Sequence, residues 1–192
     1  MDPLDFGPST RALRDLVLAT PDDALGSPTP CPAYTVADLC EHVGGLTLAF
    51  TAAAVKERLG DGDGVGDGSR LEPGWRERVA ADLDGLAAAW RDPTAYDGVT
   101  QAGPVEVPAE VAVLVALNEV VVHAWDLAVA TGRPYVGDPA AVAACAGFVA
   151  SFDAPADDGG LFGPPVEVGA SAAPLERLVA LAGRDPAWSA RG

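Results

Sequence analysis

Basic residues are scarce in this sequence, and lysine is nearly absent. Lysine and arginine number 12 against 28 acidic residues, so the 192-residue chain carries a formal net charge of −16. Lys56 is the single lysine. A protein with this charge repels polyanions, which argues against nucleic acid or an anionic membrane as a partner.

Cysteines are also few. Cys31, Cys40 and Cys145 are odd in number and have no CxxC spacing, which argues against a disulfide framework or a zinc site made of cysteines alone. The N-terminal stretch MDPLDFGPSTRALRDL lacks the basic region and apolar core of a signal peptide. We therefore expect a cytoplasmic protein with reduced thiols.

Aromatic residues make up only 6% of the chain, and alanine and valine dominate its apolar half. This composition suits closely packed helices, and the length suits one domain, residues 1–192. Residues 112–130 could span a bilayer by length, but Asn118, Glu119, His123 and Asp126 would each be costly in lipid. We expect instead a soluble helical bundle with a polar centre and no membrane partner.

Apolar periodicity, cap signals and prolines predict six helices. They cover about residues 5–18, 36–59, 73–90, 112–130, 139–151 and 174–182. Ser9 or Thr10 is the expected cap of the first helix, and Thr35 with Asp38 forms a capping box variant at the second. Residues 91–108, interrupted by prolines and glycines, are expected to form a short hairpin or an extended crossover.

Two further stretches are expected to be loops. Residues 60–70, GDGDGVGDGSR, partly match a calcium loop aligned from Asp61. Val65 stands where an oxygen ligand is required and Gly68 where an apolar residue packs, so we interpret the stretch as a solvated linker. Residues from about 153 to 192 are expected to be a loop-rich extension packed on the bundle, with FGPPVEV as a short extended strand.

Three ionisable residues share one face of the helix predicted for residues 112–130. Glu119, His123 and Asp126 have i, i+4, i+7 spacing, which places them within about 60° of one another. Each costs several kcal/mol to bury unless it is hydrogen-bonded, paired or metal-bound. Glu119 and His123, on adjacent turns, can both reach one ion, and Asp126 could orient an imidazole or a bound water or act as a fourth ligand.

The same residues have a non-metal interpretation. They could form a buried hydrogen-bonded network or pair with an arginine, for which the candidates are Arg76, Arg91 and Arg133. The second histidine, His42, lies in the helix predicted for residues 36–59 and is followed by Gly44 and Gly45. Two glycines inside a helix cost roughly 1 kcal/mol each, which indicates space for a ligand, close approach of a helix, or ordinary tight packing.

Three passages carry a resemblance to a known family. They are TPCPAYTVADLCEHVGG (residues 29–45), NEVVVHAWDLAVATGRP (118–134) and LFGPPVEV with PLERLVALAGRDPAW (161–188). With them the chain resembles the DinB-like metal-binding superfamily, in particular the branch related to the N-terminal domain of mycothiol-dependent maleylpyruvate isomerase.

The resemblance implies an all-α fold and a metal site. The fold would be a DinB-like four-helix bundle of up-down-down-up type, here with an extra short C-terminal helix and loops. His42, Glu119 and His123 would hold one divalent metal ion between helices. Two nitrogens and one carboxylate with an open position suit zinc foremost, and also nickel, iron or manganese.

The resemblance also implies an activity. It suggests a transferase or isomerase that uses mycothiol, a low-molecular-weight thiol, on a small electrophilic substrate. Only about forty residues follow the fifth helix, too few for the second, α/β domain of those isomerases, so the substrate and the thiol stay open. A metal-dependent hydrolase with Asp126 or Glu41 as base and a non-catalytic metal-binding or stress-response module are the alternatives.

Two expectations about the surroundings of the site follow. Because the surface is acidic, an anionic thiol or substrate would need a local positive charge. The candidates for it are Arg76, Arg78, Arg91 and Arg133. Because related bundles often form homodimers, a homodimer is the second expectation.

Overall fold

Six helices and one hairpin make up the regular structure of the computed structural model, which describes residues 3–32, 34–59, 64–102, 105–151 and 162–190. The helices are α1 (Gly7–Ala19), α2 (Val36–Ala54), α3 (Trp75–Ala89), α4 (Ala109–Ala130), α5 (Pro139–Val149) and α6 (Pro174–Leu181). The hairpin pairs β1 (Val99–Ala102) with β2 (Val105–Pro108), antiparallel. Short 3₁₀ turns lie at Asp22–Ala24, Gly68–Arg70 and Pro93–Tyr96.

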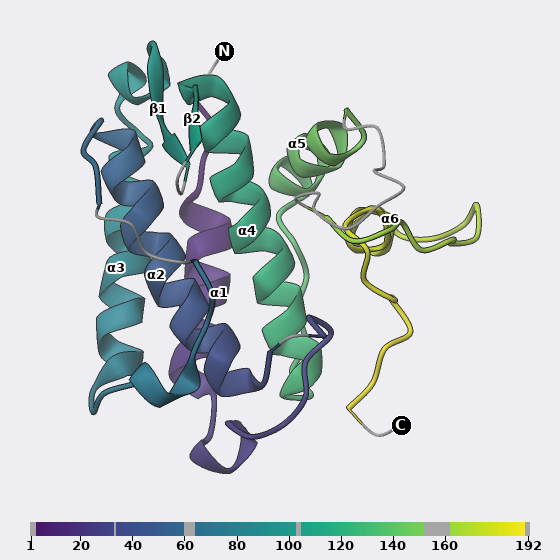
Figure 1. Cartoon of the computed structure of the whole chain (residues 1–192). Coiled ribbons are helices and arrows are strands. Elements are labelled where there is room, and N and C mark those ends of the chain that lie inside the picture. Colours follow the sequence, from purple (N-terminus) through teal and green to yellow (C-terminus); the bar gives the residue numbers. More distant parts are fainter. Residues whose placement is uncertain (1–2, 33, 60–63, 103–104, 152–161, 191–192) are drawn as a thin grey trace.

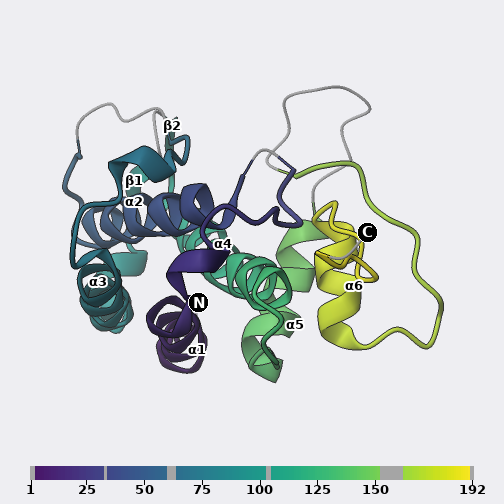
Figure 2. The ribbon, with the colours of Figure 1, turned by 90° about the horizontal axis from the view of Figure 1, so that it is seen from below.

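Four helices form the bundle. α1 packs on α3 and α4, and α2 packs on the same two helices, so α1 and α2 occupy opposite corners (Figure 2). α5 then packs on α4, and α6 packs on α5, which extends the bundle on one side (Figure 1). The all-α prediction with an additional C-terminal helix is confirmed.

The directions of the helices follow from contacts near the hairpin. The backbone N–H of Leu4, just before α1, donates to the Tyr96 hydroxyl at 2.8 Å, and the Thr100 hydroxyl donates to the Ala53 carbonyl at the end of α2 at 2.7 Å. The hairpin end therefore holds the starts of α1 and α4 and the ends of α2 and α3. This is the up-down-down-up order of the prediction.

The helix starts follow local hydrogen bonds, with one correction. The predicted capping box of α2 is confirmed, since Thr35 and Asp38 bond reciprocally. The predicted cap of α1 is wrong: Ser9 and Thr10 are buried inside the helix. The Asp5 carboxylate accepts a hydrogen bond from the Gly7 N–H at 2.9 Å instead, and Pro8 suits the first turn of a helix because its missing N–H is not needed there.

α2 is five residues shorter than predicted. It ends at Ala54, and Lys56 two residues later has a φ of 60°, a left-handed backbone that ends a helix. The Lys56 ammonium then donates to the Ala95 carbonyl at 2.5 Å. The other helix positions agree with the prediction to within about three residues, as helix ends usually do.

α4 is the central helix of the core. Sixteen of its 22 residues are buried. It is the one helix among the described residues that is long and apolar enough to cross a membrane, and 78% of its most apolar window is buried inside the fold. It ends before Gly132, whose φ of 66° favours glycine.

The interpretation of residues 60–70 as a solvated linker holds in part for the residues that the structure describes, because five of residues 64–70 are exposed, but the stretch is also attached to α2. Residues 64–70 lie against the first turns of α2: the Gly68 N–H donates to Asp38 at 2.7 Å and Arg70 pairs with Glu41 at 3.0 Å. Polar side chains of α2 thus provide hydrogen-bond and ion-pair partners for groups that were expected to be hydrated by water. Residues 60–63, with which the calcium alignment begins, lie outside the described residues.

The C-terminal segment is attached by backbone hydrogen bonds to α6. The Val166 N–H donates to the Ala180 carbonyl, and the Arg184 N–H donates to that of Val179, both at 2.9 Å. Residues 162–168 form no strand, so the extended strand predicted for FGPPVEV is wrong over the described part of that stretch.

Candidate metal centre

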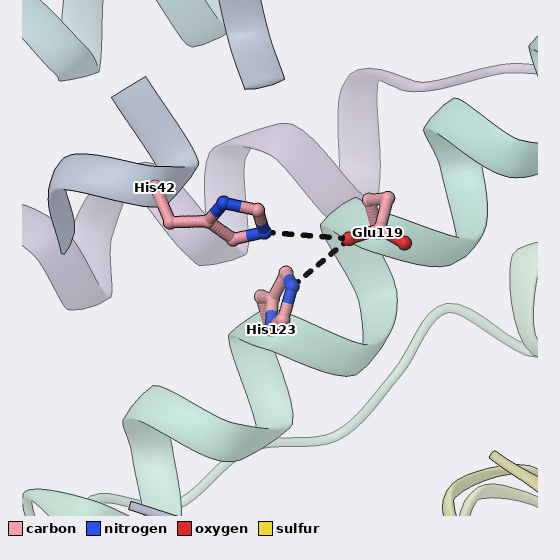
Figure 3. Close-up of side chains that lie close together, drawn as sticks. All are labelled: His42, Glu119 and His123. Carbon is pink, nitrogen blue, oxygen red and sulfur yellow. Dashed lines mark ion pairs between the residues drawn. The ribbon is translucent and has the colours of Figure 1, made fainter. Parts of the chain in front are cut away.

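Two neighbouring helices bring three ligand-type side chains together. α2 carries His42, and α4 carries Glu119 and His123 one turn apart (Figure 3). The Glu119 Oε2 atom lies 2.9 Å from His123 Nε2 and 4.0 Å from His42 Nε2. One ligand atom from each residue lies within 4.8 Å of the other two.

The donor set has the chemistry of a divalent metal site. Zinc bonds of 2.0–2.2 Å place tetrahedral ligand atoms about 3.4 Å apart, so shifts of less than about 1 Å would bring all three atoms to one ion. The side chains of His42 and Glu119 are 14% and 24% exposed, and the meeting point of the three atoms therefore stays open on one side. Two nitrogens and one carboxylate with an open position fit a catalytic ion better than a closed structural one.

Asp126 lies behind His123 on the side away from Glu119. Its Oδ2 atom is 3.0 Å from His123 Nδ1 and 3.3 Å from a guanidinium nitrogen of Arg184. When Nδ1–H donates to this carboxylate, the lone pair of the neutral imidazole is on Nε2 and points at the site. Asp126 is fully buried, so its position suits orientation of the imidazole and not direct contact with a substrate.

The charges of the site are strongly coupled. Burial lowers the pKa of His123, but its hydrogen bonds with Asp126 and Glu119 outweigh burial and raise the pKa to about 9. Burial raises the pKa of Glu119, and the hydrogen bond and charge of His123 reverse this and hold it below its ordinary value. For His42, burial and the charge of His123 lower the pKa. Without a metal the cluster therefore keeps one proton on His123, in the place that a cation would take.

A second set of contacts orients His42. Its Nδ1 atom lies 3.5 Å from the Tyr34 hydroxyl, and the imidazole has a hydrogen bond with the backbone of Gly64. The Gly66 N–H in turn donates to the Tyr34 hydroxyl at 3.0 Å. Residues 64–66 thus hold both the ligand-type histidine and its neighbouring tyrosine in position.

The three residues open into a cavity of about 270 Å³. The cavity combines polar side chains with two apolar ones, and its walls come from residues just before α2, from α2 and α4, and from the C-terminal segment. The lining residues are Cys31, Tyr34, His42, Asn118, Glu119, Val122, His123, Phe162 and Arg184. This volume is slightly below the usual range for sites that take drug-sized molecules, so the cavity suits a small ligand.

One protein family matches more than half of this chain. The model of the mycothiol maleylpyruvate isomerase N-terminal domain matches residues 6–128. The chain belongs to this family. The match includes α1 to α4 and all three of His42, Glu119 and His123.

Two relatives match this chain, and both carry the name of an uncharacterized protein. Both are from Mycobacterium tuberculosis, strains CDC 1551 / Oshkosh and H37Rv, and each is 33% identical to this chain over 119 residues. That match covers 61% of this chain and 60% of each relative, so less than two thirds of their length is shared. No solved structure matches the chain.

The arginine beside the site comes from outside the part that the family model matches. Arg184 follows α6 and lines the cavity. The four predicted arginines do not line it: Arg76 bonds to Thr20 and Asp22, Arg133 donates to the Ala19 carbonyl, and Arg78 and Arg91 are exposed. The prediction was wrong because Arg184 reaches α4 only through the packing of α6 on α5.

Four further residues that line the cavity were also not predicted from the sequence. Sequence reasoning did not assign Cys31, Tyr34, Asn118 or Phe162 to the site, although the passages that resemble the family include all four. Their helical or loop positions gave no sign of which would face inward. The sign available in the sequence was that all four residues lie in passages that resemble the family.

Three other residues singled out in the sequence analysis have different surroundings. Glu41, the alternative base, pairs with Arg70 at 3.0 Å and accepts a hydrogen bond from the Asp67 N–H. Gly44 serves close helix approach, because a Cβ there would lie 3.2 Å from the Val79 side chain of α3. Gly45 is exposed with nothing within 4 Å of such a Cβ, and none of these residues lines the cavity.

Proposed function

We propose that this protein binds a divalent metal ion through His42, Glu119 and His123. We further propose that it uses the ion, with a low-molecular-weight thiol such as mycothiol, to transfer the thiol to a small electrophile or to isomerise that electrophile. The observation that carries the proposal is the meeting of two imidazole nitrogens and one carboxylate oxygen at the wall of a polar cavity. Zinc is the first candidate, and nickel, iron and manganese suit the same donors.

The ion would supply Lewis-acid chemistry, lowering the pKa of a bound thiol so that a thiolate is available at neutral pH. The chain's own residues have separate tasks. Asp126 holds His123 Nδ1–H so that Nε2 faces the site. The Tyr34 hydroxyl and the Asn118 amide offer hydrogen bonds to a bound molecule, and Arg184 offers positive charge in a protein of net charge −16.

Metal content tests the ligand assignment directly. We expect wild-type protein loaded with zinc and desalted to retain about one equivalent, and His42→Ala, Glu119→Ala and His123→Ala each to retain much less. Elemental analysis measures the metal, and Glu77→Ala is the matched control because it removes an exposed carboxylate on α3, outside the cavity. If the triple alanine variant retains as much zinc as wild type, the assignment is wrong.

A substrate screen then tests the reaction. Metal-loaded protein is incubated with mycothiol and a small electrophile, either maleylpyruvate or an activated aryl halide, and in parallel with esters and amides without thiol. Turnover that needs the thiol supports the proposal. Turnover of esters or amides alone would point to a hydrolase, and no turnover at all would favour a non-catalytic metal-binding module.

A further inference from the structure

The turn that ends α6 sets the position of Arg184. Gly183 follows the helix with a φ of 81°, and its N–H donates to the Ala180 carbonyl at 3.0 Å. The Arg184 N–H donates to the Val179 carbonyl at 2.9 Å. These two bonds around a left-handed glycine form the Schellman motif, which ends many helices. The backbone of Arg184 is therefore held by the last turn of α6.

A close backbone contact holds the same turn from the other side. A Cβ on Gly183 would lie 2.8 Å from backbone atoms of Gly163, a distance that real Cβ atoms essentially never show. Glycine is the residue that combines so close an approach with a positive φ. The turn that carries Arg184 is thus packed between α6 and the segment that contains Gly163.

The Arg184 side chain forms a buried ion pair behind the candidate metal ligands. Its Nη2 atom lies 3.3 Å from Asp126 Oδ2, and the two side chains are 15% and 0% exposed. Its Nη1 atom donates to the Ala182 carbonyl at 2.9 Å, which anchors the guanidinium on its own turn. Asp126 Oδ2 is also the atom that lies 3.0 Å from His123 Nδ1. One carboxylate oxygen therefore joins Arg184 to His123.

The orientation of Asp126 depends on these two contacts. Its other oxygen, Oδ1, is buried and has no hydrogen-bond partner among the described residues, and the same holds for Nε of Arg184. The torsion that turns an aspartate carboxylate is broad, so hydrogen bonds must fix the plane of the group. Here Arg184 and His123 supply those bonds through the single atom Oδ2.

We propose that Arg184 is a positioning residue that acts through Asp126, holding the carboxylate against His123 Nδ1–H so that Nε2 stays directed at the site. This role is separate from the positive charge that Arg184 offers to a bound molecule. It makes the C-terminal segment, which lies outside the residues 6–128 that the family model matches, a part of the metal centre. The effect on metal affinity rests on the proposed function, whereas the positioning itself needs no metal.

Exchange of the His123 Nδ1–H proton with water tests the positioning in the metal-free protein. A carboxylate only accepts, so Nδ1 carries the proton of this bond, and NMR of His42→Gln isolates the imidazole because the chain has only two histidines. Arg184→Lys keeps the positive charge and loses the planar fork. We expect it to speed the exchange at least about five-fold, and an unchanged rate would overturn the proposal.

Arg177→Lys is the matched control for this substitution. Arg177 is an exposed arginine on α6 whose guanidinium donates to the Ala172 carbonyl at 2.9 Å. Because this bond stays within the C-terminal segment, the exchange rate and the zinc affinity should both equal those of wild type.

Zinc affinity, measured by competition with a chelator, tests the consequence for the site. Loss of the support for a metal-ligating histidine typically costs about 10–100-fold, and Arg184→Lys should weaken zinc binding about ten-fold. In an Asp126→Asn background the same substitution should change the affinity less than about two-fold, because its effect acts through Asp126. Wild-type affinity in Arg184→Lys, or a ten-fold loss that persists in the Asp126→Asn background, would overturn the proposal.

Gly183→Ala displaces Arg184 without changing its side chain. The added methyl would meet Gly163 and would strain the positive φ, so exchange should become faster and zinc binding weaker, as in Arg184→Lys. Gly169→Ala is the control, because nothing lies within 4 Å of a Cβ at that position of the same segment. Wild-type behaviour of Gly183→Ala would contradict the proposal. If wild-type protein retains no zinc, the proposed function fails alone, and the exchange rates still decide the role of Arg184.

Discussion

At the scale of residues, two histidines in one cluster have opposite pKa shifts. His123 contacts two carboxylates, Glu119 at 2.9 Å and Asp126 at 3.0 Å, and these contacts outweigh burial. His42 is 4.0 Å from Glu119, and burial together with the charge of His123 keeps its pKa low. A cluster of this kind holds one proton and exchanges it for a cation, so metal binding should release a proton.

The first prediction concerns pH in the metal-free protein. The pKa of His123 rises from 6.5 to about 9 on folding, so its contribution to stability is complete below about pH 6.5 and is lost as pH rises through about 9. Because the chain has only two histidines, NMR of His42→Gln isolates the His123 imidazole. A titration near 6.5 would show that the two carboxylates do not stabilise its charged form.

The second prediction concerns Asp126. Removing the group that orients a metal-ligating histidine typically costs about 10–100-fold in metal affinity, and Asp126→Ala should weaken zinc binding by this factor, measured by competition with a chelator. Asp126→Asn keeps an acceptor for His123 Nδ1–H and should lose less.

Asp22→Ala is the control, because Asp22 is an exposed carboxylate that also pairs with an arginine. It should bind zinc as wild type does. Wild-type affinity in Asp126→Ala would mean that this carboxylate does not orient His123.

At the scale of elements, residues 64–70 pack against the first turns of α2. A Cβ on Gly66 would meet the Asp38 carbonyl oxygen and lie 2.9 Å from His42 Cβ. Gly66→Ala should therefore displace this segment, lower the free energy of unfolding by about 1–3 kcal/mol and weaken zinc binding. Urea unfolding and the chelator competition measure the two effects.

Gly85 provides the matched comparison. It lies inside α3, and nothing lies within 4 Å of a Cβ placed there. Gly85→Ala should stabilise the protein by up to about 1 kcal/mol through helix propensity and leave zinc affinity unchanged. If Gly66→Ala behaved in the same way, the close packing of this segment on α2 would not matter for the site.

At the scale of the whole molecule, the net charge of −16 favours expansion through self-repulsion. Salt screens such repulsion, with a Debye length of about 8 Å at physiological ionic strength. We expect the Tm of the metal-free protein to rise by a few degrees between about 0.01 and 0.15 M sodium chloride. A fall in Tm over this range would mean that exposed ion pairs such as Arg14–Asp84 contribute more than the repulsion costs.

Local rules on the sequence determined several parts of this protein. The i, i+4 spacing of Glu119 and His123 fixes their adjacency wherever the helix lies, because helix geometry is the same in every fold. The capping box of Thr35 and Asp38 also follows from a short-range sequence pattern, and the structure contains it. The choice of His42 as the third candidate metal ligand needed the family resemblance, since about eighty residues separate it from Glu119.

Only the tertiary structure decided which residues close the cavity around that helix face. Arg184 and Phe162 reach the site because α6 packs on α5 and α5 on α4, and no local pattern encodes that sequence of contacts. Residues 64–70 looked like a solvated loop because several of their polar groups find partners in Tyr34 and in the side chains of α2, which are distant in the sequence. Helix geometry fixes neighbours three or four residues apart, whereas packing between distant segments depends on the shape of the whole fold.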